Sequence, residues 1–225
     1  MIPVLATMLK NSGAWRGLAL AAVLPWLAGC GSGLDIDRFW KEPRDLLVDR
    51  VEDARDAQQD AAETFRDALT EFKAVVGEPD AALAARYERL NAAFERSESA
   101  AGDISRRIDR VVSASNRLLD EWRDELDQYN DQALKRIAEQ QFDQTRARAD
   151  RLIEAMRGSE QRMQPVLDAF RDQVLYLKHN LNLSAITSLS NEAAVIETDV
   201  DALIDDMNRS IAEAEAFIEA MLDQG

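Results

Sequence analysis

The stretch LLVDRVEDARDAQQDAAETFRDALTEFKAVVG, residues 46–77, decides the fold expected for this 225-residue chain. Apolar or small residues recur in it at alternating spacings of three and four, with one polar interruption at Gln58. A mean spacing of about 3.5 residues is typical of helices that wind around one another as a left-handed coiled coil. Gly77 and Pro79 then favour the end of one helix and the start of another. The predicted core positions are Leu47, Val51, Ala54, Gln58, Ala61, Phe65, Ala68, Phe72 and Val75.

Three further segments repeat this spacing. The second predicted helix continues to about Tyr129, and Asn130 and Asp131 then supply a turn. The second has predicted core positions at Leu83, Tyr87, Leu90, Phe94, Ser97, Ala101, Ile104, Ile108, Val111, Ser115, Leu118 and Trp122. The third, ending near His179, has them at Phe142, Thr145, Ala149, Leu152, Met156, Ser159, Met163, Val166, Phe170 and Leu177. The fourth has them at Ile186, Leu189, Ala193, Ile196, Val200, Leu203, Met207, Ser210, Ala214, Phe217 and Met221.

These segments predict four helices of roughly 33, 50, 48 and 39 residues, which at about 1.5 Å per residue extend about 50 to 75 Å. Short connections make sequential helices antiparallel neighbours. The expected fold is therefore all-α, an elongated antiparallel coiled-coil bundle of about four long helices that occupies residues 44–225.

Residues 1–29 differ from the rest of the chain. They contain Lys10 and Arg16, no acidic residue, and an apolar run over residues 18–27, which is the layout of a secretory signal. The run leads into Leu27-Ala28-Gly29-Cys30, which matches the bacterial lipobox, in which the cysteine receives a diacylglyceryl group before cleavage. We therefore expect a signal peptide over residues 1–29 and a lipidated N-terminus and linker over residues 30–43. The alternatives for Cys30 are a buried thiol, a redox residue or an intermolecular disulfide.

Acyl chains on Cys30 would hold the protein on a membrane. Residue 31 is glycine rather than the aspartate that retains lipoproteins in the inner membrane. We therefore expect a cell-envelope protein, lipid-anchored at the periplasmic face of the outer membrane.

The charge of the expected mature chain narrows the choice of partners. Loss of Lys10 and Arg16 with residues 1–29 leaves 25 basic residues against 42 acidic ones, a net charge of −17. Nucleic acid is excluded because phosphate binding needs a basic surface. We expect membrane contact through the N-terminal lipid, and a protein partner or a second copy of the chain against the acidic helices.

The sequence offers few parts for catalysis. It has one histidine and lacks a Gly-rich phosphate loop, a Gly-x-Ser-x-Gly elbow and Cys/His metal spacing. Tyr176 stands three residues before His179, so the Glu-x-x-His pair of di-iron bundles is also absent. We expect no enzymatic activity, cofactor or metal, although an enzyme or metal protein that works through carboxylates is a further hypothesis.

Two arginine clusters are candidate interaction sites. Residues 110 and 151 lie about equally far from the turn near residue 130, so the clusters are expected at similar levels on adjacent helices. They would form a basic patch, or else pair with neighbours such as Asp103, Asp109 and Asp150. The clusters comprise Arg106, Arg107 and Arg110, and Arg146, Arg148 and Arg151.

The same counting predicts that residues 118–142 form a tip that projects past the start of the first helix, at the membrane-facing end. This tip carries Leu119, Trp122, Leu126 and Tyr129. These side chains would contact the membrane interface, or else pack the end of the coiled coil.

Three stretches of the chain carry a family resemblance. They are DLLVDRVEDAR at residues 45–55, EWRDELDQY at residues 121–129 and LYLKHNLN at residues 175–182. The chain resembles an uncharacterised family of Gram-negative lipoproteins, the domain of unknown function DUF2959. The resemblance implies a lipoprotein signal and a helical body, and it supplies no catalytic residues.

The last of these stretches is also a candidate site. Lys178, His179, Asn180 and Asn182 converge where the third helix should end. Asparagine in a left-handed conformation and basic side chains commonly cap such an end. The alternative is a small corner that binds an anion or a peptide, with a histidine charge that responds to pH.

Together these features favour a structural or scaffolding role for a lipid-anchored periplasmic coiled-coil protein. The alternative is a module that senses or shapes membrane curvature in the manner of BAR domains, which requires a basic membrane-facing surface.

Overall fold

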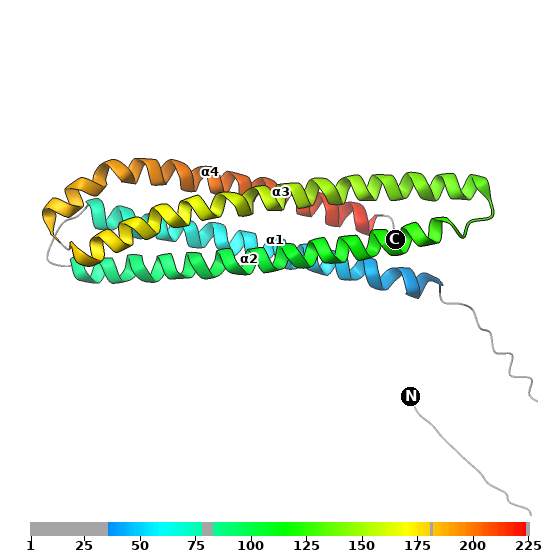
Figure 1. The fold of residues 1–225 in the computed structure, drawn as a ribbon, viewed down its shortest axis with the longest axis horizontal. Coiled ribbons are helices and arrows are strands. Elements are labelled where there is room, and N and C mark those ends of the chain that lie inside the picture. Colours follow the sequence, from blue (N-terminus) through cyan, green and yellow to red (C-terminus); the bar gives the residue numbers. More distant parts are fainter. Residues whose placement is uncertain (1–35, 78–82, 181, 224–225) are drawn as a thin grey trace, which may run out of the picture. The chain divides into compact units, whose positions relative to one another are not determined.

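The computed structural model describes residues 36–77, 83–180 and 182–223. These residues form α1 (Ile36–Gly77), α2 (Leu83–Leu126), α3 (Gln132–His179) and α4 (Leu183–Leu222), and no strand occurs among them (Figure 1). The prediction of four long helices is confirmed. Cys30 and the expected signal segment lie outside the described residues.

The four helices form an antiparallel bundle. Each packs against its neighbour in the chain, and α1 also packs against α4, which closes the bundle. The start of α1 and the end of α4 therefore lie at the same end (Figure 1). There the guanidinium of Arg44 donates a hydrogen bond to the carbonyl of Met221, in a last turn of α4 that has no basic residue of its own.

The core follows the predicted 3-4 spacing. All of the predicted core positions are buried except Leu83, Tyr87, Trp122 and Ala193, which are half-buried. The largest buried side chains include Phe72 and Phe170, whose rings meet edge to face with centroids 6.2 Å apart. Edge-to-face packing contributes stability beyond the apolar area that it buries. The repeat therefore specified which face of each helix is hidden.

The ends of α1 and α2 differ from the prediction. α1 begins at Ile36, eight residues before the expected start, and Pro43 lies buried inside the helix. Proline removes one backbone hydrogen bond there. α2 ends at Leu126, before the expected Tyr129.

The connection between α2 and α3 sets their register. Asp131 caps α3: its carboxylate accepts hydrogen bonds from the backbone N–H groups of Ala133 at 2.7 Å and Leu134 at 3.1 Å. α3 begins beyond the end of α2 (Figure 1). As a result Asp109 pairs with Arg157, whereas a turn symmetric about residue 130 would place it opposite residue 151.

Candidate functional site

The arginines of the first cluster are engaged with acidic neighbours and backbone. Arg106 and Arg107 both donate to the carboxylate of Asp103, at 3.1 Å and 2.6 Å. Arg107 also donates to the backbone carbonyl of Asp53 on α1, at 3.2 Å. The hydrogen bond from Arg107 is the largest cause of the lowered pKa of Asp103. The pairing alternative is therefore the one that the geometry supports for this cluster.

The second cluster lies at another level of the bundle. The guanidinium of Arg123 lies over the ring of Phe142, 5.8 Å from its centroid, which places the α3 residues just beyond Phe142 opposite the last turns of α2. The first cluster lies near Arg157 instead, through the pair with Asp109. The prediction that the two clusters share a level is wrong, because α3 starts past the end of α2. The structure thus brings no single basic patch together from them.

The arginines of the second cluster have different surroundings. Arg146 is exposed and approaches Asp150 at 3.8 Å, a weak solvent-screened pair. Arg148 is half-buried, and its buried Nη1 atom has no hydrogen-bond partner among the described residues. Neither arginine extends a shared surface with Arg106 or Arg107.

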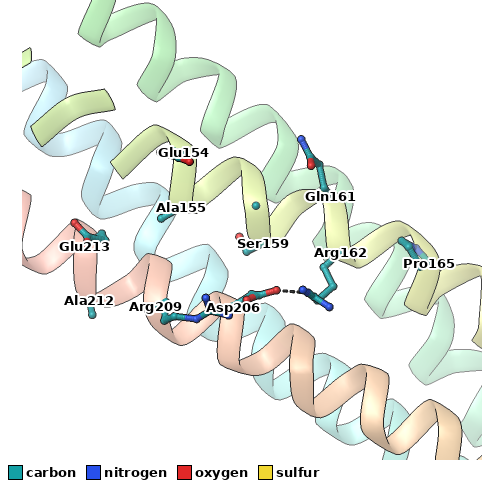
Figure 2. A pocket seen from close by; sticks show the side chains of 11 residues that line it. Glu154, Ala155, Ser159, Gln161, Arg162, Pro165, Asp206, Arg209, Ala212 and Glu213 are labelled. Atoms are coloured by element: carbon teal, nitrogen blue, oxygen red, sulfur yellow. Dashed lines mark hydrogen bonds and ion pairs between the residues drawn. The ribbon is translucent and has the colours of Figure 1, made fainter. Parts of the chain in front are cut away.

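A hollow lies between α3 and α4 (Figure 2). Arg162 of α3 and Arg209 of α4 both pair with Asp206, whose side chain is 12% exposed. The small residues Gly158 and Ala212 also line the hollow, and their small size leaves space between the two helices. Arg162, Asp206 and Arg209 therefore form a charge-paired seam between the two helices.

A layer of polar side chains crosses the core beneath this hollow. Gln58 of α1 donates a hydrogen bond from Nε2 to the hydroxyl of Ser159 on α3, at 2.7 Å. The hydroxyl of Ser210 on α4 donates to Oε1 of Gln58, at 2.8 Å. All three side chains are at most 1% exposed. The repeat identified each of them as a polar core position, but it gave no indication that they meet.

This Gln58 layer joins three helices at one height. A sliding of any of the three helices by one turn would leave buried polar groups without partners, at a cost of about 1–3 kcal/mol each. Buried polar residues in coiled coils commonly fix register in this way. The layer therefore holds the bundle in one alignment.

The corner at residues 178–182 contains a helix cap. The backbone N–H of Asn180 donates to the carbonyl of Leu177 at 3.1 Å. The side-chain amide of Asn180 donates to the carbonyl of Tyr176 at 3.0 Å. Its φ of −134° is not left-handed, so that detail of the prediction is wrong. Lys178 and His179, in the last turn of α3, are exposed, and so is Asn182, whose N–H donates to the carbonyl of Asn180. The capping alternative is the one that these contacts support.

The α2–α3 tip has a small core of its own. Trp122 meets Phe142 edge to face, with ring centroids 5.8 Å apart, and both pack with Leu119, Leu126 and Ala138. Among the tip residues that the sequence singled out, Leu119, Trp122 and Leu126 thus pack the end of the coiled coil. Desolvation, with Glu121 as a second cause, raises the pKa of Glu125 beside this cluster.

The exposed large apolar side chains of the described chain occur toward the two ends of the bundle. At the α2–α3 tip they are Tyr129, Leu134 and Ile137, and at the tip-side end of α4 there is Leu222. Toward the opposite end, where α3 connects to α4, they are Leu175, Tyr176 and Val195. The sequence analysis did not identify Leu134, Ile137, Leu175 and Val195 as exposed. The spacing of apolar residues along one helix does not show whether a second helix covers them.

The described residues offer neither a metal site nor a membrane span. They contain no group of three or more His, Cys, Asp or Glu side chains arranged to hold a metal ion. None of the described helices contains an apolar stretch long enough to span a membrane.

Comparison with known proteins gives one match. The family model for a protein of unknown function, DUF2959, matches residues 35–221. No curated protein and no solved structure matches the chain.

Proposed function

This chain belongs to the DUF2959 family of unknown function, and we propose that it is a lipid-anchored, non-catalytic scaffolding protein of the Gram-negative envelope. The observation that carries the proposal is the placement of exposed apolar side chains toward the two ends of the described bundle. The sides between carry ion pairs such as Arg157–Asp109 and Arg162–Asp206. Contacts made at the ends of long helices suit a spacer that links two structures.

The anchor follows from the N-terminal sequence. The Leu27-Ala28-Gly29-Cys30 motif favours acylation of the cysteine, and α1 begins six residues later, at Ile36. Six extended residues span at most about 20 Å. The end of the bundle that contains the start of α1 would therefore face the outer membrane from the periplasm.

The opposite end is proposed to bind a protein partner. Leu175 and Tyr176 are 50% and 40% exposed, and the exposed Lys178 lies within one turn of both. Apolar and aromatic side chains with a nearby charge are typical of the centre of a protein interface. The partner surface would offer apolar side chains and a carboxylate.

A photo-crosslinking amino acid at Leu175 in intact cells tests the partner. We expect an adduct with another envelope protein at Leu175 and none at the matched control Gln59, an exposed position midway along α1. Adducts at both sites or at neither would contradict binding through this end.

Cell fractionation tests the anchor separately. The natural chain should fractionate with the outer membrane, and Cys30→Ser should release it into the soluble fraction. A Cys30→Ser chain that stays with the membrane would contradict lipid anchoring.

Membrane-curvature sensing has weaker support. It needs a common basic face from Arg106, Arg107, Arg146 and Arg148, whereas the first two are paired with Asp103 and the two clusters lie at different levels. We expect no liposome tubulation by the unlipidated protein. Tubulation that is lost when these four arginines become glutamate would favour this alternative.

A further inference from the structure

The first turns of α3 extend past the end of α2 (Figure 1), and apolar side chains there are exposed. Leu134 and Ile137 are 54% and 55% exposed, and Tyr129 in the preceding loop is 39% exposed. Leu134 and Ile137 are three residues apart in a helix, so they share one face. These three residues form the tip patch.

The tip patch lies at the end where the N-terminal segment joins the bundle. Asp53 of α1 and Arg107 of α2 are in contact and mark one level. From that level, α1 runs back to Ile36 over about 26 Å and α2 runs on to Leu126 over about 28 Å. The start of α1 and the end of α2 are therefore nearly level, and six residues separate Cys30 from Ile36, a chain length of at most about 20 Å.

The composition of the tip indicates what would cover the patch. A tyrosine, two aliphatic side chains and the exposed Arg136 combine an apolar surface with a long cationic side chain that reaches polar headgroups. Residues 119–142 nevertheless contain seven acidic and three basic side chains, a net charge of −4. This charge disfavours anionic lipid and leaves zwitterionic lipid as the matching surface.

We propose that the tip patch inserts into the headgroup region of the bilayer that holds the lipid anchor, with zwitterionic phospholipid as its ligand. This inference rests on the proposed anchor. A tethered tip needs only weak intrinsic affinity, because the acyl chains keep it at high effective concentration beside the bilayer. Two contacts with the membrane would orient the bundle, where a single flexible tether would leave it free to tilt.

Site-specific fluorescence on the lipidated full-length protein tests the proposal. The thiol of Cys30 is consumed by the lipid, so Leu134→Cys carries a single reactive thiol for an environment-sensitive dye. Leu175→Cys is the matched control, because it lies on the same helix with 50% exposure but about 62 Å away. In vesicles of phosphatidylethanolamine and phosphatidylcholine, we expect nitroxide-labelled lipids to quench the dye at residue 134 at least threefold more than the dye at residue 175.

The outcomes separate this inference from the anchor. Equal quenching at the two positions in protein that floats with the vesicles would overturn tip insertion and leave the anchor standing. Protein that fails to float would overturn both. A concentration-dependent blue shift of the residue-134 dye in Cys30→Ser protein without vesicles would show that a second copy covers the patch, and would overturn insertion.

A second substitution checks that the patch itself is responsible. Ile137→Glu in the Leu134→Cys chain should reduce the quenching by half or more while the helical circular dichroism is unchanged, because Ile137 is more than half exposed. Quenching that persists at full strength would contradict a role for this face.

Discussion

The middle of the bundle and its α2–α3 tip share one heptad repeat but are held together differently. Around Gln58, polar side chains from three helices meet inside the core, within a continuous apolar cluster that all four helices supply. At the tip, the described cluster around Trp122 and Phe142 comes from α2 and α3 alone. The same pattern therefore gives a register-locked core where neighbours surround it, and a partly exposed end where they do not.

Truncating one aromatic in each region should show the largest difference. Phe72→Ala removes a fully buried ring that packs on Phe170, and should lower the free energy of unfolding by about 3–5 kcal/mol. Phe142→Ala at the tip should cost about 2 kcal/mol or less, because fewer neighbours lose contacts and the end can relax. Urea unfolding followed by circular dichroism measures both. Equal losses would contradict the distinction between the two regions.

The Gln58 layer comes next in size. Gln58→Ala should cost about 1–3 kcal/mol, because the buried hydroxyls of Ser159 and Ser210 each lose a partner. The triple variant Gln58→Leu, Ser159→Ala, Ser210→Ala removes the whole network and should recover most of that loss. A triple variant as unstable as the single one in urea would show that the layer acts through packing and not through hydrogen bonding.

Two ion pairs that differ in burial can be ranked in the same way. Asp206→Asn removes a mostly buried carboxylate from between Arg162 and Arg209 and should cost about 1 kcal/mol. Asp150→Asn, whose pair with Arg146 is more than half exposed on both sides, should cost less than about 0.3 kcal/mol. Thermal unfolding of both variants at low and high salt makes the comparison, and equal shifts would contradict it.

A similarly small effect is expected from the pH dependence at the tip. Burial and the charge of Glu121 raise the pKa of Glu125, so the folded state favours the protonated carboxyl group. The stability that this protonated group contributes is present below the unfolded pKa and is lost as pH rises through the folded pKa. Glu125→Gln should therefore stabilise the protein at pH 7 by a few tenths of a kcal/mol, with no gain near pH 3. Melting temperatures at the two pH values measure the effect.

Asp103 in the middle provides a control of opposite sign. Arg107 lowers its pKa, so the stability that Asp103 contributes is present above the unfolded pKa and is lost as pH falls through the folded one. Asp103→Asn should therefore destabilise the protein at pH 7 and have little effect at low pH. Shifts of the same sign for the two variants would contradict this account.

The sequence predicted burial well and register poorly, for different physical reasons. Burial depends on the helical period, which repeats many times, so single ambiguous residues such as Gln58 do not obscure it. Register depends on where α2 and α3 end, and the cap at Asp131 with the loop before it displaces α3 along the bundle. That displacement separates the arginine clusters, which a symmetric turn would have aligned.

The tip patch could not have been found from the pattern alone. Leu134 lies four residues before Ala138 and eight before Phe142, so it reads as another core position. Its exposure arises because α2 has ended beside it, which is a property of neighbouring helices and not of its own spacing. The sequence did not reveal the partners of Gln58 for the same reason. Ser159 and Ser210 lie 101 and 152 residues further along the chain, and their contact with Gln58 depends on how the helices are aligned.

The even number of helices has a practical consequence. The last helix returns to the end of the bundle at which α1 begins, and the hydrogen bond from Arg44 to Met221 joins these two helices there. A fluorescent protein fused after α4 would thus report the position of the end at which α1 begins and no other. An epitope inserted between α1 and α2 would instead sit about 60 Å away, and its accessibility to antibodies of known size would gauge how far this molecule reaches into its compartment.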